Sequence, residues 1–224
     1  DALQTMHDLQ ADFMFPIFVE NLTGFIAIQR EKEFSNEEIH DINLIMFSLS
    51  MTIENILLNK TSIKDTLTQC YNRKYLDTNL NEIMLKAMNE KESLFLFMID
   101  VDKFKEINDI QGHLIGDELL KTIVNTINDN KRFADLVFRY GGDEFTMIVK
   151  NINIEEVKNM AQRLLKAIVN LNMGVSLSIG ISELKATGQH INIKEIDAIK
   201  YSLIKTADKN LYEAKKTRNN YCLM

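Results

Sequence analysis

The 224-residue chain has little cysteine, no excess of basic charge and no long apolar run, and each shortage excludes a class of protein. Its two cysteines, Cys70 and Cys222, are too few and too isolated for a disulfide framework or a zinc site. The formal net charge of −6 argues against a nucleic-acid-binding surface. Any basic groups that matter should therefore be local and directed at phosphates.

No apolar run approaches the roughly 20 residues of a membrane span, and the first residues lack the pattern of a signal peptide. We therefore expect a cytoplasmic chain, or the cytoplasmic part of a longer signalling protein that is membrane-tethered or multidomain. Internal repeats and low-complexity tracts are absent from the sequence. Hydrophobic content of 46% and charged content of 26% are typical of a soluble globular protein with one large or two modest domains.

The segment 139–145, Arg-Tyr-Gly-Gly-Asp-Glu-Phe, is flanked on both sides by apolar, β-favouring residues and predicts a hairpin. Gly141 and Gly142 have no Cβ, so the turn can be tight and a ligand can approach its backbone. Asp143 and Glu144 would then lie beside that open space. A Gly-Gly-Asp sequence also makes ordinary solvated turns, so the rest of the chain has to decide between the two interpretations.

The N-terminal part predicts a hairpin followed by a long helix. Two short apolar runs, 13–19 and 24–29, are separated by a turn-like segment. Ser35 and Glu38 have the spacing of a capping box, which opens a helix over about 36–64. Apolar residues recur along this helix at alternating spacings of three and four, with a break before the last: Ile39, Ile42, Met46, Leu49, Ile53, Ile56 and Ile63.

This apolar stripe has two interpretations. It can pack on the hairpin, or it can form a coiled-coil seam between two copies of the chain, since a strict three-four repeat is narrower than a core-facing helix needs. Leu44, Ile45 and Leu57 widen the stripe. We therefore expect both contacts, with one face on the hairpin and one on a partner.

A polar, turn-forming stretch at 65–73 marks the predicted boundary between a first segment, 1–60, and a second domain, 61–224. The second domain is predicted to alternate strands with helices, which indicates an α/β or α+β fold whose sheet is covered by helices. In order, we predict a helix at 72–90, a buried strand at 93–99, a polar turn through Asn108 and Gly112, a helix at 115–128, the hairpin, a helix at 154–171, a half-buried strand at 175–181 and a helix at 200–216.

The buried strand ends in Asp100-Val-Asp102, at the strand edge where α/β sheets often carry their chemistry. If Asp100 neighbours the turn that carries Asp143 and Glu144, these carboxylates repel one another unless a cation lies between them. The pattern thus predicts Mg²⁺ or Mn²⁺. Because Mg²⁺ is usually held by one or two carboxylates and by substrate phosphates, it also points to a nucleotide.

Lysines follow the strand at positions 103 and 105, and a basic cluster at 215–218 ends the last helix. These cations can neutralise phosphate charge. The alternative is that they are solvated residues on helix surfaces.

Residues ~62–224 resemble a GGDEF domain, the catalytic domain of diguanylate cyclases. The resemblance implies a nucleotidyl-cyclase-like central sheet flanked by helices. It rests on motifs in the family's order and spacing: Asp65-x-Leu-Thr with Asn72-Arg73, Asp100-Val-Asp-x-Phe-Lys105, Ile107-Asn-Asp109, Gly112-His-x-x-Gly-Asp117, Arg139-Tyr-Gly-Gly-Asp-Glu-Phe145, Ser178-Ile-Gly-Ile181 and Ala207-Asp with Leu211-Tyr-x-Ala-Lys215.

Residues ~10–60 resemble the C-terminal half of a GAF domain and its exit helix. A whole GAF domain is longer, so its ligand pocket is largely absent from this segment. No sensory ligand can therefore be argued from the residues that remain.

The GGDEF resemblance implies an enzyme that condenses two GTP into cyclic di-GMP and two pyrophosphates, with Mg²⁺ or Mn²⁺ as cofactor. The catalytic residues that it implies are Asp100, Gly141, Gly142, Asp143 and Glu144. The implied metal ligands are Asp100, the carbonyl of Val101, Asp143 and Glu144, and Glu144 is alternatively implied in activating the 3′-hydroxyl. The implied GTP-binding residues are Lys103, Phe104, Lys105, Asn108, Asp117, Lys215 and Arg218.

Asn108 and Asp117 would read guanine. A carboxylate accepts hydrogen bonds from guanine N1–H and the 2-amino group, whereas adenine has no such donors. An acid at 117 therefore favours GTP over relaxed base choice.

The family's chemistry also implies a homodimer, because one domain holds one GTP and two domains must face each other. We expect the N-terminal helix to bring two copies together. The sequence departs from the family pattern at Gln69, where glycine is usual, and at 215–219, which lacks the glycine before Arg-Asn and is one residue shorter. The second departure leaves the role of Arg218 open, while Lys215 is in register.

Arg132 and Asp135 match the family's inhibitory Arg-x-x-Asp motif, with five residues between Asp135 and Gly141, and imply a second site where the product binds. The alternative to an enzyme is a silent GGDEF module that acts as a receptor for GTP or cyclic di-GMP. Such modules typically lose acids at the signature turn, and this sequence keeps both.

Overall fold

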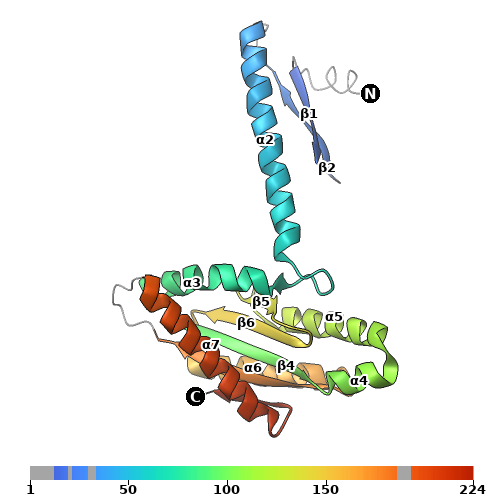
Figure 1. Cartoon of the computed structure of the whole chain (residues 1–224), viewed down its shortest axis with the longest axis vertical. Coiled ribbons are helices and arrows are strands. Elements are labelled where there is room, and N and C mark those ends of the chain that lie inside the picture. The colour runs from blue at the N-terminus through green and yellow to red at the C-terminus, as the bar shows by residue number, and fades with distance from the viewer. Residues whose placement is uncertain (1–12, 20–21, 30–33, 186–192, 224) are drawn as a thin grey trace. The chain divides into compact units, whose positions relative to one another are not determined.

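The computed structural model describes residues 13–19, 22–29, 34–185 and 193–223, and side chains within these ranges except at 13–25, 54–62 and 193–194 (Figure 1). The chain divides into two compact units, Asp1–Ser62 and Ile63–Met224. Within the described residues, no helix has the length and apolar character needed to cross a membrane.

The first unit contains the predicted hairpin and helix. Strands β1 (Phe13–Val19) and β2 (Leu22–Ile28) pair antiparallel, which confirms the hairpin, although residues 20 and 21 of its predicted turn lie outside the described residues. Helix α2 (Asn36–Ile63) begins at the predicted capping box. The Ser35 N–H donates to Glu38 Oε2 at 2.8 Å, and the Glu38 N–H donates to Ser35 Oγ at 3.2 Å.

The apolar side chains of α2 fall on two opposite sides of the helix. Met46 of the predicted stripe is buried, and Ile42 and Ile53 are half-buried. Leu44 and Phe47, by contrast, are 56% and 65% exposed. At 100° per residue these exposed side chains lie roughly opposite the stripe. Most of the described stripe is therefore withdrawn from solvent, although its Leu49 is 36% exposed, and a second apolar side is exposed. The side chains of Ile56 and Leu57 lie outside the described residues.

The second unit is built on a six-stranded sheet with the strand order β3-β5-β6-β4-β7-β8. Strand β4 pairs antiparallel with both neighbours, while the short outer strands β3 and β8 pair parallel. The predicted central hairpin is confirmed as β5 and β6. The strands are β3 (Tyr71–Asn72), β4 (Leu94–Asp102), β5 (Leu136–Arg139), β6 (Glu144–Lys150), β7 (Ser176–Leu184) and β8 (Asn220–Leu223).

Helices cover both faces of this sheet, which confirms the predicted fold class (Figure 1). Side chains of β4 alternate between two cores, since successive residues of a strand point to opposite faces. Phe95, Phe97 and Ile99 pack with helices α5 (His113–Asn130) and α6 (Ile154–Val169). Leu94, Leu96 and Met98 pack with helices α3 (Arg73–Asn89) and α7 (Ile193–Lys215).

Two predicted elements differ from the structure. The stretch expected as a polar turn forms helix α4 (Phe104–Gln111), which lies beside α5. Strand β7, expected to be half-buried, is buried on both faces because it lies between β4 and β8 and is covered by helices. Its polar side chains find partners inside: the hydroxyl of Ser182 donates to the carbonyl of Leu203 at 2.8 Å.

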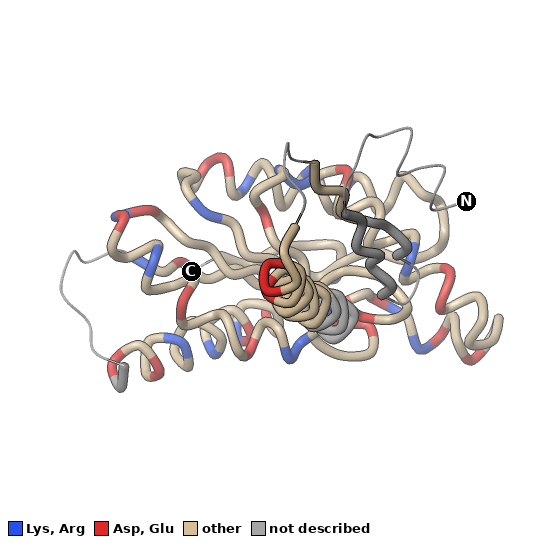
Figure 2. Tube along the Cα trace, turned by 90° about the horizontal axis from the view of Figure 1, so that it is seen from above, with Lys and Arg blue, Asp and Glu red and all other residues tan. Residues whose placement is uncertain are grey.

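Charged residues are spread over the second unit. Figure 2 shows Lys and Arg interspersed with Asp and Glu along its trace, without a continuous basic stretch. This distribution agrees with the expectation that basic groups act locally.

Candidate active site

Two carboxylates meet where β4 and β6 pair. Asp100 is the cross-strand partner of Glu144, so both side chains project from the same face of the sheet. Next to this pair, the backbone N–H of Val101 donates to the carbonyl of Asp143 at 3.2 Å. The structure thus brings the strand end and the signature turn together, as the sequence predicted.

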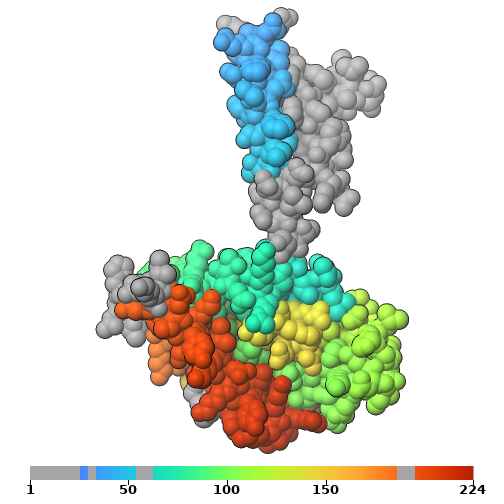
Figure 3. Space-filling model, in the orientation of Figure 1, coloured from blue at the N-terminus to red at the C-terminus, as the bar shows by residue number. Residues whose placement is uncertain are grey.

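The turn between β5 and β6 is closed by its own backbone. The N–H groups of Tyr140 and Gly141 donate to the carbonyl of Glu144 at 2.8 and 3.2 Å. A Cβ at Gly141 would lie 2.8 Å from Glu144 Oε2, so a side chain there would displace the carboxylate. A Cβ at Gly142 would meet only open space. In Figure 3 this hairpin, coloured yellow, reaches the surface between the segments of α3 and α4–α5.

Arg139 fastens this turn to the loop that precedes α3. Its guanidinium donates to the carbonyl of Gly142 at 2.8 and 3.1 Å and to Asp65 Oδ1 at 3.0 Å. Thr68 adds hydrogen bonds to the same carboxylate oxygen from its N–H and its hydroxyl, at 2.8 and 2.6 Å. Burial opposes ionisation of Asp65, but these donors and the charge of Arg139 together lower its pKa.

Lys215, at the end of α7, is the counter-ion of Asp100. Its Nζ lies 2.6 Å from Asp100 Oδ2, and the Asp100 side chain is 13% exposed. Burial raises the pKa of Asp100 although Lys215 opposes the shift, and the charges of Asp143 and Asp102 raise it further. Burial alone would lower the pKa of Lys215, but the hydrogen bond and charge of Asp100 raise it. Burial thus disfavours the charged form of Asp100, and the ammonium of Lys215 counters this effect.

The available donors fit a hard divalent cation. Carboxylates at 100, 143 and 144 and the carbonyl of Val101 are oxygen ligands of the kind that Mg²⁺ prefers. Among the described residues, no three His, Cys, Asp or Glu side chains are grouped closely enough to hold a metal alone. Such a sparse set matches an ion held by one or two carboxylates together with substrate phosphates.

The start of α4 presents backbone amides for an anion. Lys103 has a left-handed backbone with φ of 65°, and no side chain caps the helix. The first amides of a helix have no partner within the helix and carry partial positive charge. The backbone at Lys103 and Phe104 can therefore bind phosphate oxygens, with the exposed side chains of Lys103 and Lys105 nearby in sequence.

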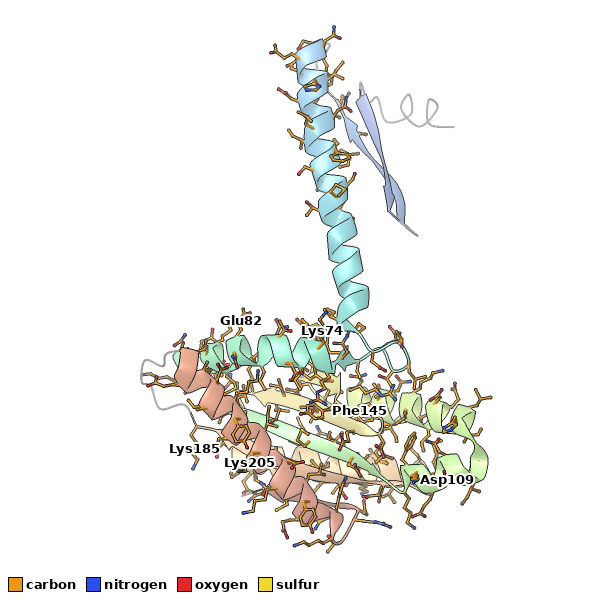
Figure 4. The ribbon with its side chains drawn as sticks, viewed as in Figure 1. Lys74, Glu82, Asp109, Phe145, Lys185 and Lys205 are labelled. Carbon is orange, nitrogen blue, oxygen red and sulfur yellow. The ribbon has the colours of Figure 1, made fainter. Side chains whose placement is uncertain are left out.

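Helices α4 and α5 bring Asn108 against Gly116, the residue before Asp117. The Oδ1 atom of Asn108 is buried and has no hydrogen-bond partner among the described residues. It packs so closely on Gly116 that a Cβ there would overlap it. Figure 4 places the neighbouring Asp109 on the same helix. An unpaired acceptor oxygen at this position fits a base that offers hydrogen-bond donors.

Sequence reasoning did not give a role to two residues that shape this site. Gly116 makes room for Asn108. Gly180 of β7 lies against the backbone of α7, where a Cβ would overlap Ala207 and Leu211, so it lets α7 lie close to the sheet. Both glycines lie within motifs noted in the sequence. The contacts that require them are with other elements of the fold, so the local sequence does not show them.

The remaining predicted residues lie at the edge of the site or away from it. Arg218 is exposed in the turn after α7 and has a left-handed φ of 55°. Arg132 and Asp135 form a closed ion pair at 2.8 Å, in which the Asp135 side chain is fully buried. Arg132 also donates to the carbonyls of Lys150 and Asn151.

This arrangement defines an α/β domain that carries acids, cations and helix-start amides in its candidate site. A family model described as "Diguanylate cyclase, GGDEF domain" matches residues 62–221, and the chain belongs to the GGDEF family.

Among its relatives, diguanylate cyclase DosC of Escherichia coli K12 is 37% identical over 164 residues, which cover 70% of this chain and 34% of DosC. Diguanylate cyclase DgcZ of the same strain is 33% identical over 224 residues, which cover 99% of this chain and 70% of DgcZ. The chain thus spans about a third of DosC. The GGDEF domain of DgcB from Caulobacter crescentus, solved in complex with c-di-GMP, matches with a TM-score of 0.62 at 25% identity, over 72% of this chain and 95% of that one.

Proposed function

We propose that this chain is a diguanylate cyclase that joins two GTP molecules into cyclic di-GMP. The observation that carries the proposal is the cross-strand pair of Asp100 and Glu144, with Asp143 beside it and the Lys215 ammonium 2.6 Å from Asp100. Relatives named as diguanylate cyclases and a related GGDEF domain solved with c-di-GMP support the same activity.

In the proposed reaction, the 3′-hydroxyl of one GTP attacks the α-phosphorus of the other. The new P–O bond forms as the bond to the β-phosphate breaks, so pyrophosphate leaves and the hydroxyl proton passes to a base. The second 3′-hydroxyl repeats the step and closes the ring. Glu144 is placed either to accept the proton or to help hold the metal, and Asn108 with Asp117 binds guanine.

The residues proposed to hold Mg²⁺ or Mn²⁺ are Asp100, Val101 through its carbonyl, Asp143 and Glu144. When bound, the cation supplies charge neutralisation for the phosphates and for the departing pyrophosphate. Lys215 and the amides at the start of α4 bind the β- and γ-phosphates, and Arg218 extends this set. Binding requires the Lys215 ammonium to exchange its contact with Asp100 for a phosphate oxygen.

Each domain binds one GTP, so the proposed enzyme is a homodimer with facing domains. The exposed side of α2 supports this, because Leu44, Phe47 and Met51 recur at spacings of three and four and are 56%, 65% and 46% exposed. A second copy of the same helix presents the same stripe and can cover it.

Product inhibition through Arg132 and Asp135 is part of the proposal. For a product to bind there, Arg132 has to release Asp135 and the carbonyls of Lys150 and Asn151, since its donors are committed to them. We expect Arg132→Ala to relieve inhibition by added cyclic di-GMP. Unchanged inhibition would contradict this part without affecting the assigned activity.

The activity is tested by incubating the purified chain with GTP and Mg²⁺ and identifying the products by mass spectrometry. We expect cyclic di-GMP and pyrophosphate in a ratio of about one to two, as the balanced reaction requires. Glu144→Gln should abolish turnover, whereas Glu213→Gln, which removes an exposed ion pair with Lys216, should not. A wild-type chain that binds GTP and forms no cyclic di-GMP would overturn the proposal.

A further inference from the structure

Asp102 has no part in the proposed chemistry, yet its carboxylate is buried and accepts three hydrogen bonds. The hydroxyls of Ser176 and Ser178 donate to it at 2.6 and 2.7 Å, and the backbone N–H of Asn219 donates at 3.1 Å. The two serines belong to β7, whereas Asn219 belongs to the turn that joins α7 to β8. A single side chain therefore ties this turn to the middle of the sheet.

The turn needs such a contact because its backbone is strained. Arg218 and Asn219 both have left-handed backbones, with φ of 55° and 43°. This conformation suits glycine, is tolerated by asparagine and is unfavourable for arginine. Helices commonly end on a left-handed glycine, and here the N–H of Arg218 makes the closing bond to the carbonyl of Ala214 at 3.0 Å without one.

The same turn follows directly on Lys215. Asp100 and Asp102 lie two residues apart on one face of β4, so they hold neighbouring parts of the same segment. Asp100 holds the Lys215 ammonium at 2.6 Å, and Asp102 holds the Asn219 backbone. The Lys215 side chain has to leave Asp100 when phosphates bind, whereas the Asn219 backbone can stay on Asp102.

We propose that Asp102 is a positioning residue for the nucleotide phosphates. By fixing the backbone of 216–219, it keeps Lys215 in reach of the phosphates after the ammonium leaves Asp100, and it offsets the absence of glycine in this turn. The inference rests on the proposed function in that it takes Lys215 as a phosphate-binding residue.

The test compares Asp102→Ala with a matched control, Ser178→Ala. Both remove a buried hydrogen bond between β4 and β7, but only Asp102→Ala removes the bond to Asn219. The probe is the α,β-methylene analogue of GTP with Mg²⁺, measured by calorimetry. We expect Asp102→Ala to weaken binding on the order of tenfold, and Ser178→Ala to stay within about twofold. Amide hydrogen exchange at 216–219 should accelerate in Asp102→Ala alone.

Two further variants keep the test decisive. Asp102→Asn preserves the volume but leaves a single acceptor oxygen, so it should weaken binding to an intermediate degree even if the alanine variant does not fold. Asn219 tolerates its left-handed backbone, but glycine favours this conformation further, so Asn219→Gly should restore part of the affinity when it is added to Asp102→Ala.

Equal effects of Asp102→Ala and Ser178→Ala, unchanged affinity in Asp102→Asn, or no recovery with Asn219→Gly would overturn the inference. A wild-type chain that binds the analogue but forms no cyclic di-GMP would refute the proposed function alone. In that case the affinities and exchange rates still decide the role of Asp102.

Discussion

At the scale of single residues, the site depends on glycines that leave room for neighbouring groups as much as on the side chains that carry its chemistry. Gly116 allows Asn108 to lie against α5, because a Cβ at this position would overlap Asn108 Oδ1. The Asn108 amide is in turn one of the groups proposed to bind guanine. A methyl group at position 116 should therefore weaken base binding by displacing Asn108.

We expect Gly116→Ala to raise the KM for GTP on the order of tenfold, because it displaces Asn108 from the base-binding position. Asn125→Ala, at an exposed position of the same helix, is the control and should leave KM unchanged. Steady-state kinetics at varied GTP concentration measure both. An unaltered KM in a folded Gly116→Ala chain would contradict a role of Asn108 in binding GTP.

Asp65 gives a second prediction, on the pH dependence of stability. Its pKa is lower in the folded chain than in the unfolded chain. The ionised carboxylate therefore contributes stability above its ordinary pKa of about 4, and this contribution is lost as the pH falls through the lowered folded-state pKa. We expect Asp65→Asn to reduce the unfolding free energy at pH 7 by about 1 to 3 kcal/mol and to flatten its acid dependence.

Urea unfolding between pH 3 and pH 7 checks this expectation. Glu118→Gln, which removes an exposed ion pair with Lys121, should change the unfolding free energy by less than about 1 kcal/mol and is the control. An Asp65→Asn chain whose stability falls with acid as steeply as that of the wild type would show that the bonds to Thr68 and Arg139 do not stabilise the fold.

At the scale of elements, strong periodic patterns predicted the structure well. The buried strand β4, helices α5 and α6 and the central hairpin all lie close to their predicted ranges. Their apolar residues repeat with the period of the element, which is a local property of the sequence. The positions of the candidate acids could be predicted for the same reason, since they stand at the ends of these elements.

Other elements depend on contacts that a local pattern does not contain. Helix α4 has no buried residue and begins at a left-handed lysine, so its sequence looks like a polar turn. Strands β3 and β8 have two and four residues and form only because β5 and β7 accept them as neighbours. The alternating serines of β7 suggested a solvent-facing side, but Asp102 and the Leu203 carbonyl bind them inside.

Helix α2 carries the prediction about association. We expect Leu44→Glu with Phe47→Glu to weaken the dimer, because two charges would enter an apolar contact. The control is Asn43→Glu with Thr52→Glu, which adds the same charges at exposed polar positions of the same helix. Analytical ultracentrifugation and cyclase activity at low protein concentration measure the effect. Equal dimerisation of both double variants would exclude this side of α2 as the contact.

At the scale of the whole molecule, the proposed reaction is shared between two chains. We expect the activity per wild-type chain to fall as a Glu144→Gln variant is mixed in, because hybrid dimers contain only one intact half of the site. Activity is measured at constant wild-type concentration after subunit exchange. The baseline is a Glu144→Gln chain that also carries Leu44→Glu and Phe47→Glu, because weakened dimerisation should keep it out of hybrid dimers. Constant activity at every mixing ratio would mean that one chain suffices.

The outer strands of the sheet have a consequence for solubility. Strand β8 pairs with residues 178–181 of β7 and so shortens the row of unpaired backbone groups that this nine-residue strand would otherwise offer at its far edge. Exposed edges of this kind recruit strands from other molecules and start aggregation. The four residues of β8 therefore oppose fibre growth templated by this edge. We expect a chain cut before Asn220 to precipitate rather than merely lose activity.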